Sequence, residues 1–512
     1  MSRAAIGMGI VAIFCLGTFV WIFMPGRTAM AIPERPRGGQ PIAAKDGAGQ
    51  SSSANSDSAA AAAIQTQMRW QAPRFIDGNF RPLSLSVDDA KAVLLTTEIE
   101  TEIGTQTLTV FDSVDGGQSW ARGETLNEYM AADGDLDLNT GDYALLGCTP
   151  TGFEPDGSVT LNRSELRVRK LGGKFSEPVK IWAAECTDDL LMLAPKLICA
   201  SGGMWAFQAR FPANTEKIPP ADPVNQGMCH MRVAHSDSSG NLKPLAGDWL
   251  IPHPPGGGRP VAWAKDEKIA GFVTTRPMIM GVPTGDGGLI HYVSRDGGGT
   301  WQSSVIPFVP DTDSEKQPRC VLPTAMTRDG DTLLLTVVAL SSLSDDYPKY
   351  QSFTLVSSDL GMTWGTPYHA SLCDERGKCA SGAHILSNQM VMGEGNTVGM
   401  RENIRMIPQM MQENDFSKRG RYNVRMSDNG GKSWLDQHAF EQLGEGTEEV
   451  VLSGSRDAVH VAIFRGATSI GSRDKGCLII RTFSNGAWAD SKEPAPAWFK
   501  ESSTPQPSSE KF

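Results

Sequence analysis

The chain has 512 residues, of which 40% are hydrophobic and 21% are charged, and its formal net charge is −11. This length accommodates one large β domain or several smaller domains. The acidic balance argues against a general nucleic-acid-binding protein, because such proteins need basic surface to neutralise phosphates. The 54 glycines suit a β protein with many turns, since tight turns often require glycine.

Residues 1–31 are expected to direct the chain to a membrane. Residues 4–24 are uncharged and mostly apolar, between Arg3 and Arg27, and a membrane-spanning helix needs about 20 such residues. Residues 29–31 read "AMA", which is similar to a signal-peptidase cleavage site. We therefore predict an N-terminal transmembrane signal-anchor helix, with a cleaved signal peptide as the alternative. The protein is then membrane-anchored and extracytoplasmic, in the periplasm or at the cell surface, or secreted if the signal is cleaved.

Two stretches of biased composition flank the folded part. Residues 32–72 are rich in Pro, Gly, Ala, Ser and Gln, which predicts a flexible linker. Residues 490–512 are rich in Pro, Ser, Lys and Glu, which predicts a disordered tail. The folded domain is therefore expected at 73–489.

Eight cysteines follow the apolar segment. An even number behind an export signal predicts disulfides in an oxidising compartment, without giving their connectivity. The best local pair is Cys373 with Cys379 in "CDERGKC"; zinc is the weaker alternative, because no second pair stands at ligand spacing. Cys229, His230 and His235 in "MCHMRVAH" are another weak metal candidate, because the segment alternates like a strand.

An acidic run, "DGDLDLN" at Asp133–Asn139, is similar to a calcium-binding loop. It departs from an EF-hand loop because Leu138 stands where that loop needs glycine, and no glutamate ends it. A solvated acidic loop is therefore the favoured interpretation, with calcium as the alternative.

One eight-residue pattern, S-x-[DN]-x-G-x-[ST]-W, occurs four times. The copies are "SVDGGQSW" at Ser113–Trp120, "SRDGGGTW" at Ser294–Trp301, "SSDLGMTW" at Ser357–Trp364 and "SDNGGKSW" at Ser427–Trp434. Their acidic or amide positions and closing tryptophans are Asp115 and Trp120, Asp296 and Trp301, Asp359 and Trp364, and Asn429 and Trp434.

Each copy follows an apolar run rich in β-branched or aromatic residues, and we call each copy a box. Asp or Asn can hydrogen-bond the turn backbone, and glycine supplies positive φ. The tryptophan offers a large apolar surface to a neighbouring sheet. Each box therefore predicts a turn, capped by its own side chains, between antiparallel strands.

The boxes also define a period. The intervals between their third residues are 181, 63 and 70 residues, so the first is close to three times the others. Two degenerate units are predicted inside it, at Leu166–Trp182 and Met231–Leu245. Six units of about 70 residues, each with four short strands, predict an all-β, six-bladed β-propeller. A last stretch, "CLIIRTFSNGAW", is expected to pair back with the first blade and close the ring; a seventh blade and an array of β-sandwiches are the alternatives.

The four boxes resemble the Asp-box (BNR) repeats of sialidases, and the tally of units resembles their six-bladed propeller. This resemblance implies a glycoside hydrolase fold without a cofactor. It also implies a site in which three arginines bind the carboxylate of a sugar acid, which suits the planar, permanently charged guanidinium.

Three arginines of this chain match the family pattern. The third family arginine precedes the last box, and "RGRYNVRMSDNGGKSW" places Arg419 in that role. The second ends a strand, and "NTVGMR" places Arg401 there. The first lies on the opening strand, and "FRPL" places Arg81 there, although the isoleucine of the family motif is absent.

The catalytic residues of the family have no direct counterparts in this sequence. The family uses a tyrosine nucleophile, a glutamate base and an aspartate acid/base. The stretch after the last box, "EGTEEVVLSGSRDAVHVAIF", has no tyrosine, and Glu448 and Glu449 fall nearest the lost nucleophile. Ser387 stands where the base is expected. The loop for the acid/base offers glutamates instead, namely Glu98, Glu100 and Glu102.

Three functions fit this pattern. The first is recognition of an anionic glycan or of a partner protein without ordinary sialidase chemistry. The second is an active glycoside hydrolase in which a carboxylate replaces tyrosine; such a carboxylate would repel a sugar acid and favour a neutral glycan. The third is a scaffold that binds only protein, because a fold does not determine a function.

Overall fold

The computed structural model describes the chain between Arg69 and Ser484, with gaps. The described ranges are 69–88, 90–99, 106–129, 131–137, 140–153, 159–182, 189–192, 195–212, 228–236, 242–245, 249–252, 260–275, 278–279, 282–283, 288–308, 320–340, 350–369, 407–412, 422–427, 435–440, 448–454, 458–465 and 476–484. They belong to one compact unit, 68–254 with 258–512. In these ranges every regular element is a strand. The predicted anchor helix and tail lie outside them.

The strands form antiparallel sheets that succeed one another along the chain. The first unit contains β3 Arg81–Asp88, β4 Lys91–Ile99, β5 Gln106–Ser113 and β6 Ala121–Tyr129. The second contains β7 Ala131–Leu136, β8 Asp142–Phe153, β9 Val159–Lys170 and β10 Val179–Lys180. The third contains β11 Asp189–Met192, β12 Lys196–Ala200, β13 Gly203–Pro212, β14 Met228–His235, β15 Lys243–Pro244 and β16 Trp249–Pro252. The second and third units are joined in one ten-stranded sheet through β9 and β11.

Three further units carry the other boxes. The fourth unit contains β17 Val261–Ala264, β18 Ala270–Thr275, β21 Gly288–Ser294 and β22 Gln302–Pro307. The fifth contains β23 Cys320–Asp329, β24 Thr332–Leu340, β25 Tyr350–Ser357 and β26 Tyr368–His369. The sixth contains β27 Ile407–Gln412, β28 Tyr422–Ser427 and β29 Leu435–Phe440. A small hairpin, β19 Met278–Ile279 with β20 Val282–Pro283, accompanies the fourth unit. The predicted six units are therefore confirmed, including the two degenerate ones.

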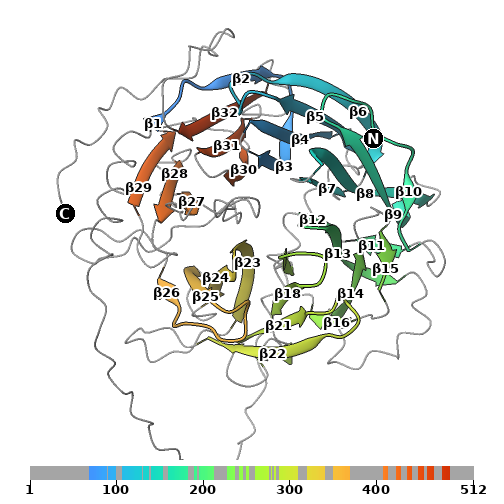
Figure 1. Cartoon of the computed structure of the whole chain (residues 1–512), viewed down its shortest axis with the longest axis vertical. Coiled ribbons are helices and arrows are strands. Elements are labelled where there is room, and N and C mark those ends of the chain that lie inside the picture. The colour runs from blue at the N-terminus through green and yellow to red at the C-terminus, as the bar shows by residue number, and fades with distance from the viewer. Residues whose placement is uncertain are drawn as a thin grey trace, which may run out of the picture. The chain divides into compact units, whose positions relative to one another are not determined.

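A further sheet joins the two ends of the folded chain. It contains β30 Glu448–Gly454, β31 Ala458–Arg465 and β32 Cys477–Ser484, and the N-terminal strands β1 Arg69–Trp70 and β2 Arg74–Asp77 both pair with β32. We call it the closing sheet. Figure 1 shows the sheets arranged radially around a common centre, with the closing sheet beside the first unit. The C-terminal stretch pairs back with N-terminal strands, as expected, but it does so in the closing sheet and not within the first unit.

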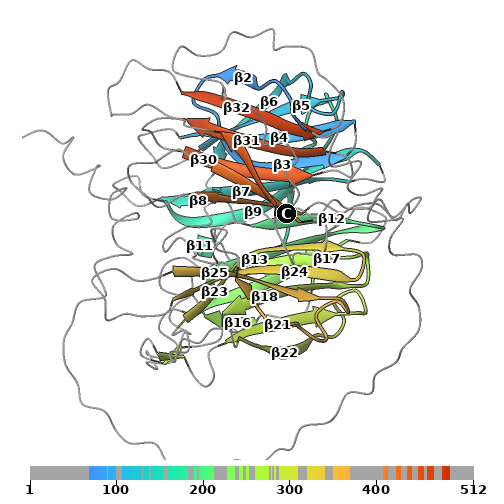
Figure 2. The same ribbon diagram turned by 90° about the vertical axis from the view of Figure 1, so that its left-hand side faces the viewer.

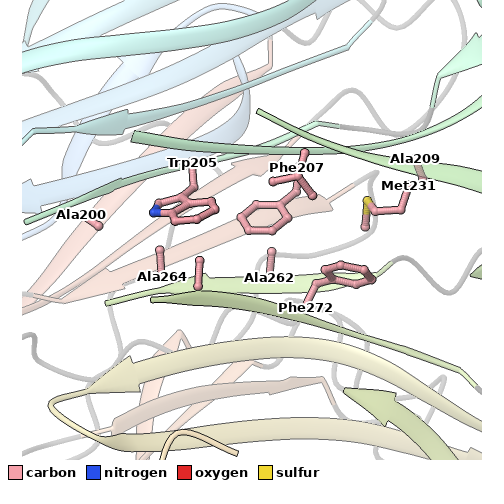
Figure 3. Close-up of a cluster of buried hydrophobic side chains, with 10 residues drawn as sticks. Ala200, Trp205, Phe207, Ala209, Met231, Ala262, Ala264 and Phe272 are labelled. Carbon is pink, nitrogen blue, oxygen red and sulfur yellow. The ribbon is translucent and has the colours of Figure 1, made fainter. Parts of the chain in front are cut away.

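Apolar clusters between neighbouring sheets hold the ring together. In Figure 3, Trp205 and Phe207 of β13 face Phe272 of β18 across the boundary between the third and fourth units. Trp301, from the box of the fourth unit, packs against this cluster and meets Trp205 edge-on at 6.4 Å between ring centroids. Trp120 packs likewise on the cluster shared by the closing sheet and the first unit. The box tryptophans thus join neighbouring sheets, as their large apolar area favours.

The box turns are built from their own side chains. In the first box, the Asp115 carboxylate accepts hydrogen bonds from the Ser113 hydroxyl (2.8 Å), the Ser119 amide (2.9 Å) and the Ser119 hydroxyl (2.6 Å). The boxes at Asp296 and Asp359 repeat the pattern. The hydrogen bonds from Thr300 lower the pKa of Asp296 below its ordinary value. The fourth box, with Asn429 and Trp434, lies outside the described residues.

A buried histidine of one sheet lies under a box glycine of the next. His460 of the closing sheet lies under Gly117, where an added side-chain carbon would come within 3.0 Å of Nδ1. His291 of the fourth unit lies under Gly361 of the fifth, and its ring overlaps the space that a side chain at Gly361 would need. His291 Nδ1 is 3.3 Å from the Gly361 carbonyl oxygen. Burial lowers the pKa of both histidines to about 4.

Gly361→Ala should destabilise the propeller far more than Gly172→Ala. Both glycines have positive φ, +82° and +72°, so each alanine costs roughly 1–2 kcal/mol of backbone strain. Only Gly361 faces a packed ring, whereas nothing lies within 4 Å of a side chain at Gly172. Overpacking adds about 1–3 kcal/mol at Gly361. Urea unfolding of the two variants measures the difference, and equal losses would contradict the histidine–glycine packing.

Acidification from pH 6.5 towards pH 4 should destabilise the fold. The unfolded chain binds protons at these histidines with a pKa near 6.5, whereas the folded chain resists protonation until the pKa of about 4. Stability is therefore full above pH 6.5 and falls below it, by up to about 1.4 kcal/mol per pH unit for each histidine. His460→Gln should flatten this dependence in denaturant titrations at pH 7 and pH 5. An unchanged slope would show that His460 does not contribute.

Candidate functional site

The first box and Arg81 lie on opposite faces of the ring. Ser113, which opens the first box, pairs with Ala92, and Gly116 of that box donates its amide hydrogen to the Ala90 carbonyl oxygen. The box therefore lies where β3 ends. Because strands alternate in direction within each unit, Arg81 at the start of β3 lies on the opposite face. We call this opposite face, where the innermost strands begin, the mouth face.

The innermost strands of neighbouring units run in the same direction. Near the end of β3, the Ser86 hydroxyl donates a hydrogen bond of 2.9 Å to Asp135 near the end of β7. At the start of β3, the Arg81 guanidinium carbon lies 5.8 Å from the centre of the Phe464 ring in the closing sheet. Figure 1 shows β3, β7, β12 and β30 near the centre, and Figure 2 shows β30 and β31 stacked against β3 and β4.

The structure brings Arg81 to the strand that carries Glu448 and Glu449. Both glutamates open β30, and Glu449 is the cross-strand partner of Phe464, over whose ring Arg81 lies. The first unit and the closing sheet thus meet at the mouth face. Only the backbone of these two glutamates is described, so the structure places them by register.

Glu98 lies at the same end of the first unit but on the other face of its sheet. Arg81 is paired with Thr97 on β4, and Glu98 follows Thr97 directly. Successive residues of a strand point to opposite faces. The sheet therefore separates Glu98 from the guanidinium of Arg81. The other predicted site residues lie outside the described ranges: Arg401, Arg419, Glu100, Glu102 and Ser387.

Two carboxylates of the acidic run, Asp133 and Asp135, join two inner strands; the solvated loop predicted there is wrong for these residues, because they belong to β7 and Asp133 is buried. Asp133 accepts the Leu197 amide hydrogen at 2.9 Å, and Asp135 accepts the Cys199 amide hydrogen at 2.8 Å. An inner strand exposes an unpaired edge, whose amides need acceptors. These two carboxylates of β7 satisfy the edge of β12. In the described part of the chain, no group of three or more His, Cys, Asp or Glu residues is arranged to hold a metal ion.

The histidine and cysteine candidates have packing roles where the structure describes their side chains. His235 of β14 stacks on Trp205, with 4.1 Å between ring centroids. Cys477 is a buried free thiol whose pKa is raised by burial to about 12, so the prediction of disulfides does not extend to it. Cys373 and Cys379 lie outside the described ranges.

Sequence reasoning missed two residues beside Arg81. Phe464 is 2% exposed and lies under the guanidinium. Asn79 is two residues before Arg81 and accepts a hydrogen bond of 3.2 Å from the Gly476 amide. The only local signal for Asn79 was the turn-forming "DGN" at Asp77–Asn79. Phe464 and Gly476 are distant in sequence and carried no signal.

No protein-family model and no curated protein matches the chain. Among solved structures, the chain is similar to the β-propeller domain of the Trilobed protease from Pyrococcus furiosus, with 10% identity and a TM-score of 0.42 over 82% of this chain and 99% of that one. It is also similar to Trypanosoma rangeli sialidase in complex with the inhibitor DANA, with 14% identity and a TM-score of 0.39 over 80% of this chain and 55% of the sialidase. A third similar structure is Penicillium chrysogenum α-L-arabinanase complexed with arabinobiose, with 10% identity and a TM-score of 0.38 over 80% and 98%. These similarities concern the propeller fold, and a sialidase is one of the three structures.

No helix of membrane-spanning length and apolarity occurs within the residues that the structure describes.

Asp135→Ala should lower the free energy of unfolding by about 1–3 kcal/mol, because it leaves the Cys199 amide without this acceptor at the edge of β12. Asp137→Ala is the matched control, since Asp137 accepts a hydrogen bond of 3.0 Å from the Thr140 hydroxyl in an exposed turn. The control should change stability by less than about 0.5 kcal/mol. Denaturant unfolding of both variants provides the measurement. Equal effects would contradict the edge-capping role.

Proposed function

We propose that the mouth face binds an anionic glycan, through the carboxylate of a sugar acid, without ordinary sialidase turnover. The observation that carries the proposal is the position of Arg81, which opens an innermost strand and lies over Phe464 of the adjoining sheet. A guanidinium held in this way can donate two parallel hydrogen bonds to a carboxylate. Arg401 and Arg419 complete the set of three arginines that the family resemblance implies.

The proposal of recognition without turnover rests on the missing tyrosine. No tyrosine follows Tyr422 in the chain, and the strand nearest the expected nucleophile begins with Glu448 and Glu449 instead. Tyrosine bears no charge near neutral pH, whereas an ionised glutamate would repel the carboxylate beside the reacting carbon of a sugar acid, so a glutamate does not replace tyrosine as the nucleophile for such a substrate. The N-terminal segment is proposed to hold the domain at an extracytoplasmic membrane surface, where glycans are displayed.

A second candidate is hydrolysis of a neutral glycoside with Glu449 as the nucleophile. It is favoured by the register of β30, which pairs Glu449 with Phe464 next to Arg81. Retaining glycosidases ordinarily use a carboxylate in this role. Fluorogenic neutral glycosides test it: release of the fluorophore by the full chain, abolished by Glu449→Gln, would establish the hydrolase and contradict recognition without turnover.

Arg81→Ala should weaken binding of N-acetylneuraminic acid by roughly 10- to 100-fold, because a charge-assisted hydrogen bond contributes about 1.5–3 kcal/mol. The full chain in detergent is titrated by calorimetry. Arg295→Ala is the matched control, since Arg295 is an exposed arginine in a box on the opposite face. Its affinity should match the wild type. Equal affinities of the wild type and Arg81→Ala, or no binding of any sugar acid by the wild type, would overturn the proposal.

A further inference from the structure

Only three residues of the chain separate Arg81 from the strand pair that closes the ring. The N-terminal strand β2 pairs with β32, from Arg74 with Ile480 to Asp77 with Cys477. The chain then turns through Gly78, Asn79 and Phe80, and Arg81 opens β3. We call residues 78–80 the corner. Any displacement of β2 from β32 is therefore transmitted to Arg81 through three residues.

Two reciprocal hydrogen bonds fix the corner to the closing sheet. The Gly78 amide donates to the Gly476 carbonyl oxygen at 3.0 Å, and the Gly476 amide donates to Asn79 Oδ1 at 3.2 Å. Gly78 has a φ of +131°, which residues with a side chain rarely adopt. A side chain at Gly476 would come within 2.6 Å of the Phe464 ring. The corner thus contacts Gly476 so closely that both positions require glycine.

The same ring, Phe464, supports the guanidinium of Arg81. Phe464 lies between Glu449 and Leu478 in the register of the closing sheet, and Arg81 lies over its face. A cation over an aromatic face is held there by the quadrupole of the ring. Phe80 of the corner is anchored separately, edge-on against Phe111 at 5.0 Å. The corner and Phe464 together set where the guanidinium points.

We propose that Asn79 is a positioning residue for Arg81, and that it couples ring closure to ligand binding at the mouth face. This inference rests on the proposed function of Arg81. A ligand that binds only when Arg81 is in place must stabilise the pairing of β2 with β32, because linkage is reciprocal. Ligand binding then stabilises the pairing of β2 with β32, and this pairing in turn positions Arg81 for the ligand.

Asn79 suits a test because its side chain is exposed, in contrast to Phe464. The hydrogen bond that it accepts is partly buried and comes from the buried Gly476, so its loss is expected to cost up to about 1–3 kcal/mol of stability. Asn79→Ala removes the acceptor of the Gly476 amide, whereas Asn79→Asp keeps an oxygen in its place. Asn127→Ala is the matched control, because Asn127 is also exposed and accepts one hydrogen bond, from Thr107 at 3.4 Å, in the outer strand β6.

The experiment measures the affinity of the full chain for N-acetylneuraminic acid and the hydrogen exchange of β2 and β32 with and without that sugar. Asn79→Ala should weaken binding at least fivefold, while Asn79→Asp and Asn127→Ala stay within twofold of the wild type. The sugar should slow amide exchange of residues 74–77 and 477–480 at least fivefold in the wild type, and leave it unchanged in Arg81→Ala.

The outcomes separate this inference from the proposed function. If Arg81→Ala loses the sugar but Asn79→Ala binds it as the wild type does, the positioning role is wrong and the proposed function stands. If Arg81→Ala binds normally, both are wrong. If the melting temperature of Asn79→Ala is markedly lower than that of the wild type, amide exchange of the wild-type protein is the deciding measurement. Slower exchange of residues 74–77 and 477–480 in the presence of the sugar supports the coupling, and unchanged exchange overturns it.

Discussion

Pairing of the two chain ends is the constraint on which the rest of the structure depends. The last sheet of the ring takes strands from the first part of the described chain, because β1 and β2 both pair with β32. Trp70 packs on Phe483 at 5.2 Å across this seam. Closure brings the start of β3 beside β30, although their residues are separated by most of the domain. The candidate site therefore lies at the seam itself.

The described boxes all join their unit to the preceding sheet in one way. A box turn presents its tryptophan and its glycines to the preceding sheet, and that sheet supplies apolar side chains and, at Gly117 and Gly361, a buried neutral histidine. The hydrogen bonds of each described turn are local.

Local features could be predicted from the sequence, whereas distant contacts could not. The boxes predicted their turns because Ser, Asp and Gly form those hydrogen bonds within eight residues. Leu360 shows the limit of that rule: it has a φ of +57° where the other described boxes have glycine, and burial against Trp263 and Leu333 accompanies this conformation. The strand β1 at Arg69–Trp70 lies at the end of the stretch predicted as linker, because only its partner β32 makes it a strand. For the site, Arg81 was found by resemblance, but Asn79 and Phe464 were not, since their roles exist only once the ring has closed.

The most direct test of the central claim is a crystal structure of the full chain soaked with N-acetylneuraminic acid. The account predicts that the sugar carboxylate lies at the mouth face within hydrogen-bond distance of the Arg81 guanidinium, next to the seam between β3 and the closing sheet. A sugar bound elsewhere, or a mouth face that stays empty at saturating sugar, would contradict it.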